Sequence, residues 1–101
     1  MGNGLCLPLN LIVQIKIPRE VGWPEYRQKV AELFARHGGR YLVRGGPVEV
    51  LEGSYDGRRL IVFEFPSMEA IHSVWHSPEY ADVKKLREGA GELDLWAVPG
   101  V

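Results

Sequence analysis

The sequence predicts an α+β domain of the ferredoxin-like plan, in which four antiparallel strands form one sheet with helices on a single face. The first observation behind this is periodicity, because apolar residues alternate every second position in some segments and recur at helical spacing in others. The second is the order of these segments: strand, helix, strand, strand, a helix in two pieces, and strand. The chain of 101 residues is long enough for one such domain with a modest core.

The first strand and the first helix are expected between residues 11 and 36. Every second residue of Leu11–Ile17, beginning with Leu11, is apolar, which is the period of a strand, and Pro18 ends this strand. A helix then runs through Arg36, because Pro24 suits a first helical turn and Gly38 suits the turn that ends a helix. One stripe of this helix is expected to face the sheet, and its members are Tyr26, Val30, Leu33, Phe34 and His37.

The middle of the chain predicts two further strands. The second strand covers Arg40–Arg44, is bent by the Gly-Gly-Pro sequence at 45–47, and resumes over Val48–Glu52. The proline of that bend has no backbone N–H to donate, which places the second strand at an edge of the sheet. After a turn over Gly53–Gly57, the third strand covers Arg59–Phe65.

The remainder predicts a helix in two pieces and a last strand. A serine hydroxyl can accept the free backbone N–H groups at the start of a helix. Ser67 therefore begins the first piece, which runs through Trp75, and Ser77 begins the second piece, which ends near Glu88. The last strand covers Leu93–Val98.

One domain is expected over residues 11–101, preceded by an arm over residues 1–10. The arm lacks the basic start and the long apolar run of a secretory signal. No apolar stretch approaches the roughly 20 residues of a membrane span. The single cysteine, Cys6, excludes an internal disulfide and a thiolate cluster, so the composition suits the reducing cytoplasm.

The charges of the chain are balanced. Twelve basic and thirteen acidic side chains give a formal net charge of −1, and neither sign forms a long run. A protein that binds nucleic acid or an anionic membrane needs a basic face. We therefore expect neither as a partner.

Both faces of the predicted sheet carry apolar residues. The third strand, for example, places Leu60 and Val62 on one face and Ile61, Phe63 and Phe65 on the other. A sheet whose second face meets water should alternate between apolar and polar positions. A second copy of the chain is the simplest cover for such a face, so the pattern predicts a homodimer.

Four separated blocks of the chain resemble the signatures of the family called domain of unknown function 1330: Gly38–Gly46, Val48–Gly53, Glu64–Ser67 and Ser77–Tyr80. The resemblance covers residues from about 11 to 101 and implies a dimeric α+β barrel, in which two ferredoxin-like sheets face each other. It implies no established activity, and related barrels include cofactor-independent monooxygenases, lactone isomerases and haem-binding enzymes. The chain departs from the family pattern at Trp23–Pro24 and over Ile71–His76.

Five side chains are candidates for a ligand pocket between the sheet and the helices. Arg44 and Glu64 are charged residues in apolar strands, where a charge is costly unless it is paired or solvated. In one interpretation, the Arg44 guanidinium orients an anionic substrate and the Glu64 carboxylate beside it acts as a base. In the other, the two residues form a structural ion pair or lie at strand ends that reach water. Trp75 and Tyr80 flank the break between the two helical pieces, where they either line a pocket or fill the core. His76 joins them as a candidate for proton transfer.

No metal and no cofactor are expected. His72 and His76 lie four residues apart on a predicted helix, so both rings could face one side and share a metal ion. The Glu that follows the first His in the usual zinc helix is replaced by Ser73, and no third ligand is nearby in sequence. The two glycines at 45 and 46 lead into a strand segment and not into a helix, which predicts a bulge and not a phosphate loop.

The sequence leaves several functions open. The first is a small cytoplasmic homodimer that binds a small organic molecule, such as an anion, in a cleft between sheet and helices. The second is a cofactor-independent monooxygenase-type or isomerase-type enzyme, in which Glu64, His76 or Tyr80 moves a proton. A third is a structural role without a ligand. The first two need a pocket with converging polar groups, and they differ in whether a titratable group there faces room for a reacting atom.

Overall fold

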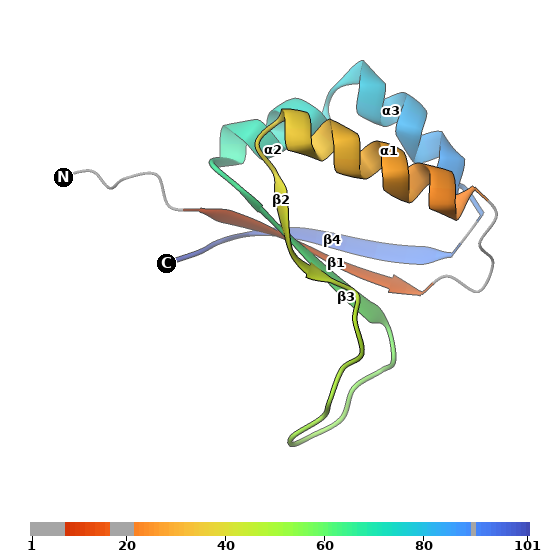
Figure 1. The fold of residues 1–101 in the computed structure, drawn as a ribbon, viewed down its shortest axis with the longest axis vertical. Helices are drawn as coiled ribbons and strands as arrows, with labels where there is room; N and C mark the ends of the chain where they lie inside the picture. Colours follow the sequence, from red (N-terminus) through yellow and green to blue (C-terminus); the bar gives the residue numbers. More distant parts are fainter. Residues whose placement is uncertain (1–7, 17–21, 90) are drawn as a thin grey trace.

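The computed structural model describes residues 8–16, 22–89 and 91–101. The elements follow the predicted order: β1 (Leu9–Lys16), α1 (Trp23–Arg36), β2 (Arg40–Arg44), β3 (Arg59–Phe65), α2 (Met68–Trp75), α3 (Pro78–Lys84), the 3₁₀ turn η1 (Lys85–Arg87) and β4 (Glu92–Pro99). The four strands form one antiparallel sheet in the order β2-β3-β1-β4, with all helices on one face (Figure 1). This is the ferredoxin-like fold that the sequence predicts. No helix in the described ranges is both long enough and apolar enough to cross a membrane.

Strand β1 lies in the centre of the sheet, and its side chains alternate between the two faces of the sheet. It pairs with β3 on one side and with β4 on the other, and Leu11, Val13 and Ile15 are buried against the helices. The residues between them point to the opposite face of the sheet. The strand begins at Leu9, earlier than predicted, because Leu9 already pairs with Phe65. Residues 1–7 of the predicted arm lie outside the described residues.

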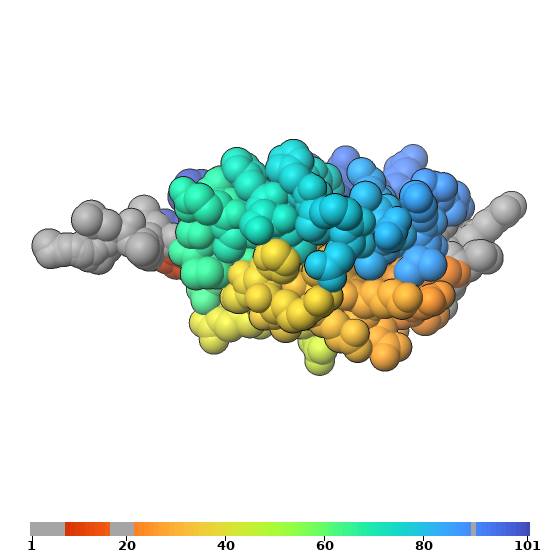
Figure 2. Space-filling view, turned by 90° about the horizontal axis from the view of Figure 1, so that it is seen from above, coloured from red at the N-terminus to blue at the C-terminus, as the bar shows by residue number. Residues whose placement is uncertain are grey.

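The core lies between the sheet and the helical layer, in which α1 runs beside α2 and α3 (Figure 2). Phe34 of α1 meets the sheet through edge-on contacts with Phe63 and Phe65, at centroid distances of 4.8 and 5.5 Å. Gly39 leaves room for this packing, because a Cβ atom at that position would lie 2.7 Å from the Phe65 ring. The buried residues of α1 largely match the predicted stripe: Trp23, Tyr26, Val30, Leu33 and Phe34.

The two predicted serine caps are confirmed. The Ser67 hydroxyl accepts the backbone N–H of Ala70 at 3.1 Å, and the Ser77 hydroxyl accepts that of Tyr80 at 3.0 Å. Ser77 also donates its own proton to the carbonyl of Val74 at 2.7 Å, which ties the end of α2 to the start of α3. The predicted second helical piece corresponds to α3 together with η1.

The second strand is shorter than predicted. It ends at Arg44, and residues 46–58 form an irregular segment that projects beyond the sheet before β3 begins (Figure 1). The prediction that the strand resumes over Val48–Glu52 is therefore wrong. Gly45 adopts a φ of 80°, a conformation in which glycine carries no steric cost, and the chain leaves the sheet there. The prediction that this strand lies at a sheet edge is confirmed.

The face of the sheet opposite the helices carries an apolar row that crosses all four strands. The row consists of the register partners Val43, Val62, Ile12 and Trp96, one from each of β2, β3, β1 and β4. Trp96 is 45% exposed and Val43 is 40% exposed, although both are large apolar side chains. The two-sided apolar pattern of the sequence is therefore present in the folded chain.

Candidate functional site

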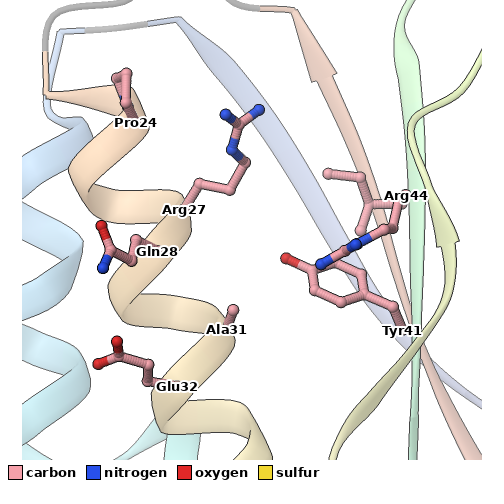
Figure 3. A pocket seen from close by; sticks show the side chains of 8 residues that line it. Pro24, Arg27, Gln28, Ala31, Glu32, Tyr41 and Arg44 are labelled. Atoms are coloured by element: carbon pink, nitrogen blue, oxygen red, sulfur yellow. The ribbon is translucent and has the colours of Figure 1, made fainter.

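A groove of about 710 Å³ opens between α1 and the edge of the sheet formed by β2 and β3 (Figure 3). It exists because the apolar stripe of α1 packs against the inner strands and leaves the edge strand uncovered. Every residue of β2 except Tyr41 is exposed. The helix contributes Pro24, Arg27, Gln28, Ala31 and Glu32 to the groove, and the sheet contributes Tyr41, Arg44 and Ile61.

An irregularity in β2 brings two of these side chains together. The register of β2 with β3 shifts between Tyr41 and Val43, so that Tyr41 pairs with Phe63 and Arg44 pairs with Ile61. Because Phe63 and Ile61 both face the helices, Tyr41 and Arg44 do so as well. The Arg44 guanidinium lies over the Tyr41 ring, 4.5 Å from its centroid.

Two guanidinium groups border the groove from opposite walls. Arg27 leans from α1 toward the sheet edge, whereas Arg44 and the Tyr41 hydroxyl lean from β2 back toward α1 (Figure 3). The polar ends of Gln28 and Glu32 point away from β2. Within residues 8–16, 22–89 and 91–101, neither arginine forms a salt bridge with a carboxylate.

The electrostatic environment of Tyr41 keeps its hydroxyl protonated. Partial burial raises the pKa of this hydroxyl above its ordinary value, and the positive charges of Arg44 and Arg27 oppose the shift. At neutral pH the group is therefore a hydrogen-bond donor to whatever the groove holds.

Glu64 lies on the other face of the sheet from Arg44. The antiparallel register places Glu64 directly opposite Arg40, and a salt bridge of 2.8 Å joins their side chains. An ion pair between Arg44 and Glu64, one of the interpretations that the sequence left open, is therefore not formed. At the other end of the same face, Arg58 forms ion pairs with Asp94 and with Asp56.

Tyr80 belongs to the core. It is 1% exposed, and its hydroxyl lies 3.1 Å from that of Tyr26 on α1. Burial, together with the neighbouring Tyr80 hydroxyl, raises the pKa of Tyr26 far above its ordinary value. The Arg87 guanidinium lies over the Tyr26 ring, 5.5 Å from its centroid. These contacts join α1, α3 and η1 and leave Tyr80 with no access to a ligand.

Trp75 and His76 lie on the far side of the helical layer from the groove. Trp75 packs on Tyr80, with ring centroids 4.9 Å apart, and lines a second hollow of about 260 Å³ between α2 and strands β1 and β4. His76 ends α2 and is exposed, with its ring 6.0 Å from that of His72. The residues that line this second hollow are mainly apolar: Leu11, Ile71, His72, Trp75, Leu95 and Ala97.

The five candidates predicted from the sequence therefore do not gather in one pocket. Only Arg44 lines the groove, and only Trp75 lines the second hollow. The sequence does not point to Tyr41, because strand alternation alone places it on the face opposite Arg44. It does not point to Arg27 either, because this residue lies outside the apolar stripe of α1. In the part of the chain that the structure describes, no cluster of three or more His, Cys, Asp or Glu side chains could hold a metal ion.

Comparisons with known proteins agree with this architecture. A family model described as "Domain of unknown function (DUF1330)" matches residues 10–101. No curated protein matches the chain. A solved protein of unknown function from Rhodopseudomonas palustris is 20% identical with a TM-score of 0.77, and the match covers 96% of this chain and 85% of that one. SnoaB, a cofactor-independent oxygenase from Streptomyces nogalater, is 10% identical with a TM-score of 0.61, covering 94% of each chain. At these identities the likeness is one of fold.

Proposed function

The chain belongs to the family described as domain of unknown function (DUF1330), and we propose that it binds a small organic anion in the groove between α1 and the sheet edge. The convergence of Arg27, Arg44 and the Tyr41 hydroxyl on this groove carries the proposal (Figure 3). Guanidinium groups donate paired hydrogen bonds that match the geometry of a carboxylate. Two such groups without a carboxylate partner among the described residues provide a site for the carboxylate of a ligand.

The titratable groups of the groove favour binding over proton transfer. Tyr41 has a raised pKa and therefore is not a base at neutral pH. The carboxylate of Glu32 points away from β2 (Figure 3). Glu64, His76 and Tyr80, which the sequence offered for proton transfer, do not line the groove. A bound anion would thus be held without a base directed at it.

Isothermal titration calorimetry with benzoate and succinate tests this proposal. We expect saturable binding of at least one of them, with affinity reduced about tenfold by Arg27→Gln or Arg44→Gln, as loss of a charged hydrogen bond predicts. Lys29→Gln is the matched control, because Lys29 lies on α1 outside the groove and pairs with Glu25 at 3.5 Å. If neither probe binds, or if the control weakens binding as much as the groove variants, the proposal is wrong.

The second hollow favours a second candidate function, a cofactor-independent oxygenase-type reaction like that named for SnoaB. Its walls are mainly apolar and include Trp75, and His72 supplies one titratable group. An apolar wall holds an aromatic substrate, and an imidazole can remove a proton from it. Incubation of the chain with 1-naphthol in air, followed by mass spectrometry, separates the two functions, because 1-naphthol itself supplies the electrons for dioxygen and only turnover above a protein-free control yields 1,4-naphthoquinone and water.

We propose further that two copies of the chain pair through the open face of the sheet. The apolar row of this face is flanked by charged pairs, Arg40 with Glu64 at one end and Arg58 with Asp94 at the other. An apolar centre within a polar rim is the usual anatomy of a protein interface. We place this dimer in the cytoplasm, where reducing conditions suit a chain with a single cysteine.

A further inference from the structure

We infer that the anion held by the groove is an aromatic carboxylate, whose ring lies against the Arg44 guanidinium over Tyr41 and whose carboxylate reaches Arg27. This inference rests on the proposed function of the groove and narrows it to one class of ligand. It follows from the shape and the chemistry of the three walls that the groove presents.

The first wall is a flat cationic platform. The Arg44 guanidinium lies over the Tyr41 ring, 4.5 Å from its centroid, so the ring supports the cation from one side. The structure describes no carboxylate that would draw Arg44 out of this arrangement. Arg44 is exposed and lines the groove, so a second ring can approach its guanidinium from the groove. Guanidinium planes stack on aromatic rings more readily than on saturated ones.

The second wall is apolar. Ile61 from β3, together with Pro24 and Ala31 from α1, supplies apolar lining to the groove. Ala31 lies one helical turn after Arg27, so its small apolar side chain neighbours Arg27 on the same face of α1. Apolar surface of this kind is stabilised by covering it with carbon atoms, which an inorganic anion cannot supply.

The third wall carries the second positive charge of the groove. Arg27 leans across the groove toward β2 (Figure 3). Its charge is close enough to Tyr41 to lower the pKa of that hydroxyl against the effect of burial. A molecule that touches all three walls therefore needs a flat apolar body and one acidic group. A dicarboxylate without a ring would meet the two guanidinium groups but would leave the apolar wall uncovered.

Four probes separate this inference from the broader proposal: benzoate, cyclohexanecarboxylate, benzyl alcohol and inorganic phosphate, each titrated into the full chain. We expect benzoate to bind about fivefold more tightly than cyclohexanecarboxylate, which has the same charge but no aromatic face. Benzyl alcohol and phosphate should bind more weakly than either. Equal affinity for the two carboxylates, or tighter binding of phosphate, overturns the inference but leaves the anion site standing. If no carboxylate binds, both fail.

Two variants test the platform directly. Arg44→Lys keeps the positive charge but removes the planar guanidinium, so benzoate should lose about fivefold in affinity while cyclohexanecarboxylate changes little. Arg27→Gln should weaken both carboxylates by a similar factor. Arg40→Gln is the control, because Arg40 lies on the same strand but faces the other side of the sheet, paired with Glu64. Equal losses of both carboxylates in Arg44→Lys would show that charge alone is recognised.

Discussion

At the scale of single residues, the hydroxyl groups of Tyr26 and Tyr80 form a polar contact inside the apolar core. The hydroxyls of Tyr26 and Tyr80 lie 3.1 Å apart, so each has a partner inside the core. Trp23 stacks on Tyr26 at a centroid distance of 5.2 Å, and Arg87 covers the same ring. Burial disfavours the charged phenolate of Tyr26 and so raises the pKa of this residue.

The pair predicts how stability depends on pH. The folded chain holds Tyr26 protonated, whereas the unfolded chain ionises it near the ordinary pKa of 10.0. The unfolded state therefore binds fewer protons above that pH, and the free energy of unfolding should fall by roughly 1.4 kcal/mol for each further pH unit. Tyr41, whose pKa is also raised, acts in the same direction. Urea unfolding at several pH values from neutral to strongly alkaline measures the effect.

Tyr26→Phe removes the group and should reduce this alkaline loss of stability. Tyr55→Phe is the control, since Tyr55 is an exposed tyrosine on the projecting segment. A slope that is the same in wild type and in Tyr26→Phe would contradict the prediction.

At the scale of elements, the helices differ in how their first turns are held. Helices α2 and α3 begin at serines whose hydroxyls accept a backbone N–H. Helix α1 has no side-chain cap and begins at Gly22, whose φ is 72°. A Cβ atom at Gly22 would lie 2.1 Å from the carbonyl oxygen of Leu86, so the start of α1 depends on close packing against η1.

The serine caps predict an order of stabilities. Ser67→Ala removes one accepted hydrogen bond and should lower the free energy of unfolding by about 1 kcal/mol. Ser77→Ala should cost more, because its hydroxyl also donates to the carbonyl of Val74. Ser54→Ala, in the exposed projecting segment, is the control and should change stability little. Chemical denaturation of the three variants checks the order, and a larger effect at Ser54 than at Ser77 would contradict it.

At the scale of the whole molecule, the arrangement of layers creates the two surfaces to which we assign a function. Helices cover only one face of the sheet, which leaves the apolar row open on the other (Figure 1). The helical layer also stops short of the edge strand β2, which leaves the groove. The first is the surface that we propose for a second copy of the chain, and the second is the one that we propose for a ligand.

The open face predicts a dimer that a single charge disrupts. Sedimentation should give about twice the chain mass of 11.4 kDa at micromolar concentration. Trp96→Lys should shift the chain to the monomer, because burying an unpaired ammonium in the interface costs several kcal/mol. Since Trp96 is 45% exposed in the single chain, the variant should still fold. Leu51→Lys, at a side chain 90% exposed on the projecting segment, is the control. A monomeric wild type contradicts the prediction.

The sequence by itself determined the elements whose signals are local. The strand over Arg59–Phe65 and the helix that follows Ser67 have the bounds that their patterns predict. Alternation, a serine hydroxyl and a helix-ending glycine act within a few residues, so each can be recognised without knowing what packs against it. Their order along the chain was enough to predict the ferredoxin-like fold.

Only the tertiary structure decided the candidate site. Alternation places Tyr41 and Arg44 on opposite faces, but the shifted register with β3 turns both toward α1. The same register pairs Glu64 with Arg40 and not with Arg44. Arg27 reaches the groove only because α1 packs beside the edge of the sheet. No pattern within one segment predicts these features, because each depends on how two segments far apart in the chain pack together. This holds for the bulge in β2, for the register of β2 with β3, and for the distance between the helical layer and the sheet.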